Sequence, residues 1–256
     1  MKRIVLTDGG MGQELLRRSG AAPTPLWSAR VLIDEPDLVR DLHADFIDAG
    51  ARVITINTYA ATPERLEREG VGELFEELQQ RGIDLAKQAR DMTGADVRIA
   101  GCLPPLFGSY KPELTLSFDE TLEIYRRVVA AQKDQVDLIL CETMASAEEA
   151  LAAATAASEA SLPVWVSWTL QDSLDGAQLR SGETIEEAAK AIAHIKFEAR
   201  MINCSKPEVI SAGMDDLIAL GGPVGAYANG FTSIGALKHG GTVDVLEARR
   251  DLGPES

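Results

Sequence analysis

The chain has 256 residues, of which 45% are hydrophobic and 25% charged, and its formal net charge is −15. This composition is typical of a chain with a packed core and excludes an intrinsically disordered one. The acidic balance argues against nucleic acid and anionic membrane surfaces as partners.

The ends and the cysteines of the sequence bear on location. The first residues carry a basic pair, Lys2 and Arg3, but an apolar run far shorter than that of a signal peptide. No stretch approaches the roughly 20 apolar residues of a membrane span. The three cysteines are not spaced as in a disulfide scaffold. We therefore expect a cytoplasmic protein without a membrane anchor.

Short apolar runs rich in β-branched residues recur along the chain, and a helical pattern follows each. Several of the runs lack polar alternation, which is typical of strands buried on both faces of a parallel sheet. Seven runs are found, at residues 4–7, 53–56, 97–100, 136–140, 164–168, 201–203 and 224–227.

Helix starts are marked by Ser/Thr-x-x-Glu patterns, in which the two side chains satisfy the first free amides of a helix. Four pairs fit the pattern: Ser117 with Glu120, Ser146 with Glu149, Thr184 with Glu187, and Ser205 with Glu208. Pro36 and Pro207 are expected near helix starts, and Gly50 at a helix end.

This alternation predicts either a closed barrel or an open doubly wound sheet. No Gly-x-Gly-x-x-Gly turn follows the first strand, which disfavours a dinucleotide-binding sheet. We predict an α/β fold, a (β/α)8 TIM barrel that forms a single domain over residues 1–256.

A complete barrel has eight strands, one more than the sequence supplies. We expect the eighth strand and its helix to be missing from this chain and the barrel to be open between its first and seventh strands. The Gly-rich stretch 230–241, the segment after it or a second copy of the chain would cover the opening. Alternatively, residues 242–246 form the closing strand.

In such barrels, the chemistry gathers at the carboxyl ends of the strands. The strand ends carry Asp8-Gly9-Gly10, Asn57-Thr58-Tyr59, Gly101-Cys102, Cys141-Glu142-Thr143, Trp168-Thr169, Asn203-Cys204-Ser205 and Asn229. The three histidines, His43, His194 and His239, all lie elsewhere. The pattern therefore favours metal, lysine or carboxylate chemistry over a histidine base.

Each candidate also has a structural interpretation. Glu142 ends an apolar strand, where a carboxylate is costly without a partner, and this favours a functional role. Asp8 and Gly9 are equally typical of a tight turn. Cys204, taken alone, is more typical of a small buried hydrophobe, as are Cys102 and Cys141.

Five segments occur in order at these strand ends: Leu-Thr-Asp-Gly-Gly-Met-Gly-Gln-Glu-Leu at 6–15, Pro-Leu-Trp-Ser-Ala at 25–29, Thr-Ile-Asn-Thr-Tyr at 55–59, Cys-Glu-Thr at 141–143 and Ile-Asn-Cys at 202–204. Together they resemble the homocysteine S-methyltransferase family, over a span from the first strand to about Asn229. The resemblance implies a (β/α)8 barrel that holds one zinc ion through three cysteine thiolates. Such an enzyme passes a methyl group from an onium-type donor to homocysteine and gives methionine.

Carried over by residue, the resemblance makes Cys204 the first zinc ligand, in an Asn-Cys motif with Asn203. It places Asp8 and Gly9 in the turn beside homocysteine and makes Glu142 the carboxylate that holds the substrate amino group. Trp27 and Tyr59 match positions near the methyl donor, so the predicted substrate-binding set is Asp8, Gly9, Trp27, Tyr59, Glu142 and Asn203.

The sequence departs from the family pattern in two places. The family's other two zinc ligands are adjacent cysteines, whereas here Gly240-Gly241 is followed by Thr242 and no Cys-Cys pair occurs. We expect those two ligands beyond residue 256, together with the eighth strand. After the third strand, Gly101-Cys102-Leu103-Pro104-Pro105 stands where the family usually has Gly-Ser-x-Gly-Pro.

The implied chemistry agrees with the absence of histidine at the strand ends. Zinc bound by three thiolates keeps one position open, where the sulfur of homocysteine binds as a thiolate without a protein base. The expected partners are homocysteine and a small methyl donor (adenosylmethionine, S-methylmethionine or betaine), and a homo-oligomer is left open. Two rivals remain: a Schiff-base lyase that uses Lys206, and a metal-free barrel that binds an amino acid.

Overall fold

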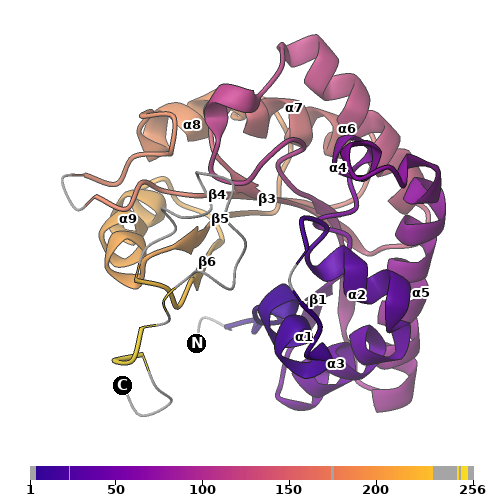
Figure 1. Cartoon of the computed structure of the whole chain (residues 1–256). Helices are drawn as coiled ribbons and strands as arrows, with labels where there is room; N and C mark the ends of the chain where they lie inside the picture. The colour runs from indigo at the N-terminus through magenta and orange to yellow at the C-terminus, as the bar shows by residue number, and fades with distance from the viewer. Residues whose placement is uncertain (1–3, 23, 174–175, 233–246, 248, 253–256) are drawn as a thin grey trace.

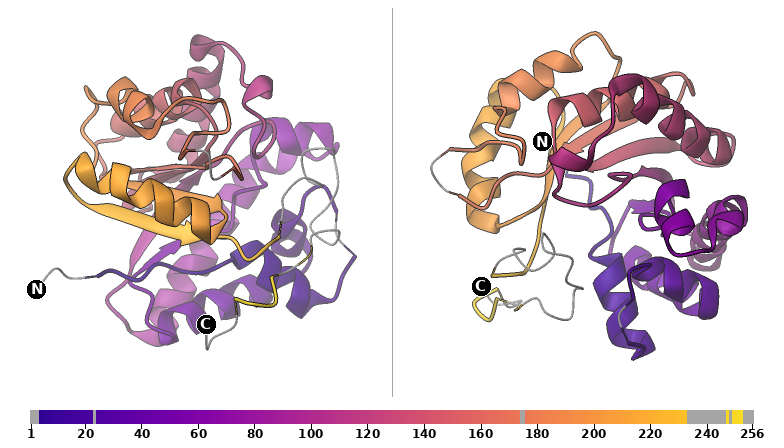
Figure 2. Two further views of the ribbon diagram at one scale, coloured as in Figure 1. Left: turned by 90° about the vertical axis from the view of Figure 1, so that its left-hand side faces the viewer. Right: turned by 45° about the horizontal axis from the view of Figure 1, so that its top comes forward.

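A computed structural model describes residues 4–22, 24–173, 176–232, 247 and 249–252. In this part of the chain, six parallel strands form one sheet in chain order. They are β1 (Val53–Thr55), β2 (Arg98–Leu103), β3 (Leu138–Met144), β4 (Val164–Trp168), β5 (Ala199–Ser205) and β6 (Val224–Ala228). The sheet curls, with helices on its outer face (Figures 1 and 2). The predicted α/β barrel architecture is confirmed, in the form of a partial barrel.

The helices fill the connections between the strands. Before β2 lie α1 (Met11–Ser19), α2 (Ser28–Asp34), α3 (Pro36–Asp48), α4 (Pro63–Arg68), the short η1 (Gly72–Leu74) and α5 (Phe75–Thr93). After β2 lie η2 (Pro112–Leu114), α6 (Phe118–Gln132), α7 (Ala147–Ser158), α8 (Ile185–Ala191) and α9 (Pro207–Ala219). In the described part of the chain, no helix combines the length and apolar character needed to cross a bilayer.

The predicted helix starts are mostly confirmed. Complete capping boxes open α6 at Ser117 and α8 at Thr184, and Ser146 caps α7. The prediction at Ser205 is wrong, because this residue ends β5 and its hydroxyl accepts a hydrogen bond from the Leu170 amide at 2.8 Å. Helix α9 begins one residue after Lys206, with Pro207 in its first turn.

The predicted first strand, residues 4–7, is shorter than expected. Only Thr7 forms a parallel bridge, to Val53, although the Arg52 amide also donates to the Leu6 carbonyl at 2.8 Å. Ile4 is 92% exposed, because no described element covers its outer side. The segment nevertheless lies beside β1, in the place of a first barrel strand.

The barrel is open between this segment and β6. Within the described ranges, no strand pairs with the outer edge of β6 or with the outer side of Thr7. Figure 2 shows the two edges at the open side of the curled sheet. Residues 242–246 and most of the Gly-rich stretch 230–241 fall outside the described residues, so the predictions made for them stay predictions.

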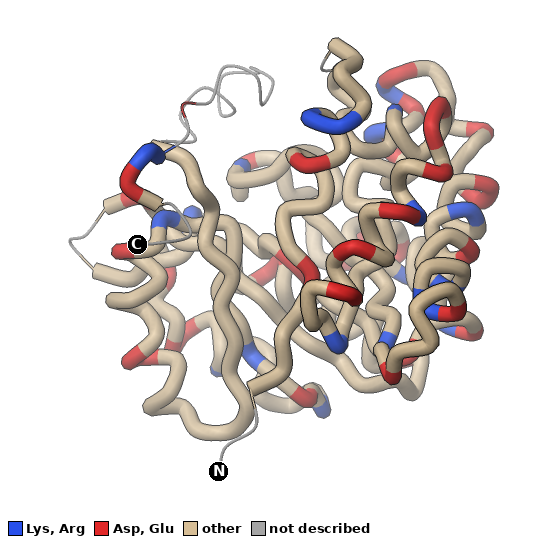
Figure 3. The backbone as a smooth tube through the Cα atoms, turned by 90° about the horizontal axis from the view of Figure 1, so that it is seen from below, with Lys and Arg blue, Asp and Glu red and all other residues tan. Residues whose placement is uncertain are grey.

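Two apolar clusters stabilise the sheet. The larger one packs the helices against the outer face, and charged residues lie mainly on the outer helices (Figure 3). A smaller cluster fills the inner face at the amino-terminal end of the barrel, with Val53, Ala100, Leu138, Trp165, Ala199 and Met201. Above this small cluster, toward the carboxyl ends of the strands, the inner face is hollow.

Candidate active site

A cavity of about 580 Å³ lies at the carboxyl ends of the strands. Val53, Trp165 and Met201 belong both to the inner cluster and to the cavity lining, and so form its floor. The walls come from the turn after Thr7, the start of α2, the ends of β1, β3 and β5, and the loop 107–111. This is the end of the barrel where catalytic groups are expected.

Two irregularities in the sheet direct side chains into this cavity. The register of β3 against β4 shifts between Cys141 and Met144, and that of β5 against β6 shifts between Asn203 and Ser205. Thr143 and Cys204 lie at these shifts in the left-handed backbone region, with φ of 61° and 50°. Such bulges commonly re-aim side chains near active sites.

The Asn203 side chain ties the two irregular strands together. Its Oδ1 accepts hydrogen bonds from the Thr143 amide at 3.0 Å and from Ser167 Oγ at 2.8 Å. Its Nδ2 donates to Thr143 Oγ1 at 2.8 Å. Asn203 lines the cavity, but these bonds occupy its polar atoms, so its contribution is to fix the residues around it.

Cys204 places its sulfur at the cavity wall, among hydroxyl and amide donors. Thr143 Oγ1 donates to Sγ at 3.7 Å, Asn203 Nδ2 lies 3.4 Å away, and the Tyr110 hydroxyl bonds to the same sulfur. Burial raises the pKa of this thiol to about 11, so without a nearby cation it is protonated at neutral pH.

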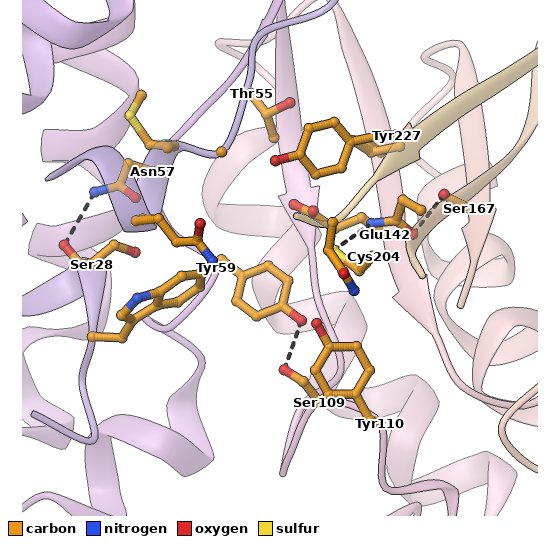
Figure 4. A pocket seen from close by; sticks show the side chains of 18 of the residues that line it. Ser28, Thr55, Asn57, Tyr59, Ser109, Tyr110, Glu142, Ser167, Cys204 and Tyr227 are labelled. Carbon is orange, nitrogen blue, oxygen red and sulfur yellow. Dashed lines mark hydrogen bonds between the residues drawn. The ribbon is translucent and has the colours of Figure 1, made fainter. Parts of the chain in front are cut away.

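Glu142 projects into the same cavity from β3 (Figure 4). The thiol of Cys102, on the neighbouring strand β2, donates to Glu142 Oε1 at 3.0 Å. Burial raises the pKa of Glu142 to about 7, and the bond from Cys102 partly opposes this rise. Cys102 is thus buried, as its structural interpretation implies, and is also the hydrogen-bond partner of a cavity carboxylate.

Asp8 supplies a second buried carboxylate. The Thr55 amide donates to Asp8 Oδ2 at 2.7 Å, which fixes the turn after Thr7 to the end of β1. Burial, and to a lesser degree the charge of Glu142, raise the pKa of Asp8 to about 7. The next residue, Gly9, allows this close packing, because a Cβ atom there would lie 2.8 Å from the Phe46 ring. The wall formed by Asp8, Glu142 and Cys204 is called the acidic wall below.

An aromatic side adjoins the acidic wall, and Tyr110 links the two through its bond to Cys204. Trp27 and Tyr59 meet edge to face with ring centroids 5.9 Å apart, and the Tyr59 hydroxyl lies 2.7 Å from Ser109 Oγ. Tyr110 lies beside them with its hydroxyl toward that of Tyr59 (Figure 4). Arg180, whose side chain is buried, covers the Tyr110 ring at 5.1 Å and pairs with Asp172 at 3.1 Å. We call Trp27, Tyr59 and Tyr110, with the nearby Arg65, the aromatic wall.

All of the predicted site residues, Asp8, Gly9, Trp27, Tyr59, Glu142, Asn203 and Cys204, line this one cavity. Lys206 does not line it, and neither do His43 and His194, the two histidines in the described residues. Sequence reasoning missed Tyr110, Tyr227, Ser167 and Arg65. Tyr110 and Arg65 follow no expected strand directly, so only the folded loops bring them to the cavity.

The described residues do not complete a metal site by themselves. None of their His, Cys, Asp and Glu side chains form a group of three or more that could hold a metal ion. Cys102 and Cys141 are buried free thiols outside the cavity lining, and the sequence contains no cysteine besides these two and Cys204. A zinc site at Cys204 would therefore need ligands that these residues do not provide.

The known proteins to which this chain is similar are methyltransferases. A sequence profile described as homocysteine S-methyltransferase matches residues 5–250. A selenocysteine methyltransferase from Astragalus bisulcatus is 33% identical over 250 residues, which cover 85% of this chain and 72% of that protein. A homocysteine S-methyltransferase from Escherichia coli (strain K12) is 30% identical over 236 residues, covering 85% and 74%.

A solved structure of a homocysteine methyltransferase also resembles this chain. The crystal structure of the homocysteine methyltransferase MmuM from Escherichia coli, in its metallated form, matches with a TM-score of 0.77 at 26% identity. The match covers 89% of this chain and 92% of that one. The similarity thus extends to the arrangement of the strands in space.

Proposed function

We propose that this chain, which belongs to the homocysteine S-methyltransferase family, transfers a methyl group from an onium-type donor to the sulfur of homocysteine, giving methionine. The observation that carries the proposal is the meeting of Asp8, Glu142 and Cys204 in one cavity beside an aromatic wall. Residues 1–256 are assigned to a single barrel domain. The three free thiols support a reducing, cytoplasmic setting.

Homocysteine is assigned to the acidic wall. Its ammonium group would bind Glu142, because an ammonium stabilises a buried carboxylate whose one hydrogen-bond donor among the described residues is the Cys102 thiol. Asp8 and Gly9 would form the adjoining side of this subsite, and Asn203 would act through the strands that it fixes. In this orientation, the sulfur of the substrate lies toward Cys204.

The methyl donor is assigned to the aromatic wall. A sulfonium or quaternary ammonium group is attracted to the faces of Trp and Tyr rings. Trp27 and Tyr59 offer such rings in the same cavity as Cys204. The two subsites thus hold the reactants in one cavity, and orientation of this kind alone contributes several kcal/mol to a bimolecular reaction.

Cys204 is proposed as one thiolate ligand of a zinc ion. Its place in the cavity wall and the metallated state of the related MmuM structure support this assignment. The other two thiolates that the family resemblance implies are not among the three cysteines of this sequence. For this reason, the proposed roles of Glu142, Asp8 and the aromatic wall rest on their own contacts and not on the metal.

A direct assay tests the function. The protein is incubated with homocysteine and, separately, with S-methylmethionine, betaine and adenosylmethionine, and methionine is measured by mass spectrometry. A parallel reaction with selenocysteine as acceptor tests the activity that the name of the Astragalus relative states. Formation of methionine with at least one donor is the expected result. No methyl transfer to homocysteine from any donor, in a protein that also contains the two further zinc thiolates expected beyond residue 256, would reject the proposal.

A further inference from the structure

The aromatic wall contains a buried guanidinium without a carboxylate beside it. Arg65, in α4, is 9% exposed and lines the cavity. Its Nε donates to the Leu106 carbonyl at 3.3 Å, and its Nη2 donates to the Pro105 carbonyl at 2.7 Å and to Ser109 Oγ at 3.4 Å. All three acceptors are neutral, and none of the ion pairs among the described residues includes Arg65.

The Nη1 nitrogen of this guanidinium has no hydrogen-bond acceptor among the described residues. It is not fully buried, and the residue lines the cavity. Burial of a charge without an opposite charge is strongly unfavourable. An anionic group of a bound molecule would supply the missing partner.

The neighbours of Arg65 tie it to the donor subsite. Its guanidinium carbon lies 5.3 Å from the centroid of the Tyr59 ring, and Ser109 contacts both Arg65 and the Tyr59 hydroxyl. Arg68, the other arginine that lines this part of the cavity, already has a carboxylate partner, Glu69, at 3.7 Å. The charge of Arg65 lowers the pKa of the buried Glu149, but that carboxylate accepts a hydrogen bond from the Ala145 amide at 2.9 Å and forms no ion pair with Arg65. Among the described residues, Arg65 is thus the arginine of this part of the cavity that forms no ion pair.

We propose that Arg65 is the residue that binds the carboxylate of the methyl donor. This inference rests on the proposed function. A simple onium cation at the aromatic wall would be repelled by the guanidinium behind Tyr59. A zwitterionic donor instead places its carboxylate toward Arg65 and its onium group toward the acceptor sulfur. Arg65 is then a specificity-determining residue that selects against cations without a carboxylate.

Two matched pairs of ligands separate recognition from a purely structural role. S-methylmethionine is compared with its carboxamide, and glycine betaine with choline, in equilibrium binding by calorimetry. The wild type should bind the carboxylated member of at least one pair ten times or more tighter. Arg65→Gln, which keeps amide donors for the loop carbonyls, should remove this preference. Arg65→Lys, which keeps the charge, should retain part of it.

Arg68→Gln is the matched control, because that side chain already has a carboxylate partner, and it should keep the wild-type preference. If Arg65 only held the loop in place, Arg65→Gln would weaken the binding of both ligands of a pair equally. That result would overturn the inference. So would a wild type without any preference, binding of neither carboxylated probe, or an equal loss of preference in Arg68→Gln.

The methyl-transfer assay separates the two proposals. A retained Arg65-dependent preference without methyl transfer would reject the function alone. Methyl transfer without that preference would reject the role of Arg65 alone.

Discussion

The two walls of the cavity differ in charge and in construction. The acidic wall holds two carboxylates, Asp8 and Glu142, and burial raises the pKa of each to about 7. The aromatic wall holds the Arg65 guanidinium, whose hydrogen bonds all go to neutral acceptors. Among the described residues, no cation forms an ion pair with Asp8 or Glu142, and no carboxylate forms one with Arg65. A cavity of this kind suits two zwitterions, one presenting an ammonium group and the other a carboxylate.

Construction differs as much as charge. The side chains of the acidic wall stand on strands or directly beside them, and the bonds from Asn203 to Thr143 and Ser167 fix the strand irregularities that aim them. The aromatic wall comes from connections: Trp27 precedes α2, and Tyr110 lies in the loop after β2. Substitutions in the acidic wall should therefore act on one ligand contact, whereas those in the aromatic wall also act through loop position.

The largest effect is expected from Cys204→Ser. The substitution keeps a polar atom for Thr143 and Asn203, so the strand irregularity should persist and circular dichroism should be unchanged. A hydroxyl is a far poorer zinc ligand than a thiolate. In a protein that also contains the two further thiolates expected beyond residue 256, the variant should lose its zinc and methionine formation should fall to background. Zinc content equal to that of the wild type, measured by atomic absorption, would contradict the assignment of Cys204.

Glu142→Gln is expected to give the next largest effect. A charge-assisted hydrogen bond to the substrate ammonium contributes about 1.5–3 kcal/mol, so the KM for homocysteine should rise roughly 10- to 150-fold. The KM for the donor should change little, because the donor is assigned to the other wall. Glu69→Gln, at the aromatic side of the cavity, is the control and should leave the KM for homocysteine unchanged. Equal changes in both KM values for Glu142→Gln would contradict the assignment of homocysteine and the donor to separate walls.

The sequence predicted the acidic wall better than the aromatic one, for a physical reason. Parallel strands bring their carboxyl ends to one rim, so Asp8, Glu142 and Cys204 could be grouped from their positions after apolar runs. Tyr110 and Arg65 belong to connections whose path depends on tertiary contacts, such as the bonds from Arg65 to the loop carbonyls. No local pattern in the sequence indicates such a path.

The fold, too, was predicted well in some features and poorly in others. The strand order follows from the alternation, and capping boxes predicted the starts of α6 and α8. The expected helix start at Ser205 failed, because the irregularity at Cys204 extends β5 through Ser205. The Ser-x-x-Glu pattern also occurs by chance, and pairing across the sheet overrode it here. Equally, the left-handed conformations of Thr143 and Cys204 leave no signature in the residue types themselves.

The pH dependence of homocysteine binding tests the role of the acidic wall. An ammonium group binds the ionised form of Glu142, and the free carboxyl, with its pKa near 7, is largely protonated below that pH. Affinity should therefore fall as the pH drops through 7, by about tenfold per unit once the pH is well below it, and should level off above it. Because Asp8 titrates in the same range, the measured midpoint belongs to the pair.

Calorimetry in two buffers with different ionisation enthalpies measures the protons released on binding. In protein without zinc, where the substrate thiol keeps its proton, release should be close to zero at pH 8 and should increase toward pH 6. Glu142→Gln should flatten the profile. A profile that is flat between pH 5.5 and 8 in the wild type would show that the substrate ammonium does not bind a titrating carboxylate.

The smallest effect is expected from the Cys102 thiol, which acts on the acidic wall through Glu142. Cys102→Ala removes the donor to Glu142 Oε1, and because that bond lowers the pKa of the carboxyl, its loss should shift the midpoint of homocysteine binding to higher pH. A neutral hydrogen bond contributes about 0.5–1.5 kcal/mol, so the KM for homocysteine should rise by roughly 2- to 13-fold, with little change in kcat. Cys102→Ser keeps a donor and should stay close to the wild type. Cys141→Ala is the matched control, since Cys141 is equally buried in the same cluster but forms no hydrogen bond to Glu142 among the described residues. It should lower the free energy of unfolding without moving the midpoint. The same midpoint in the Ala and Ser variants of Cys102 would show that its thiol only fills space.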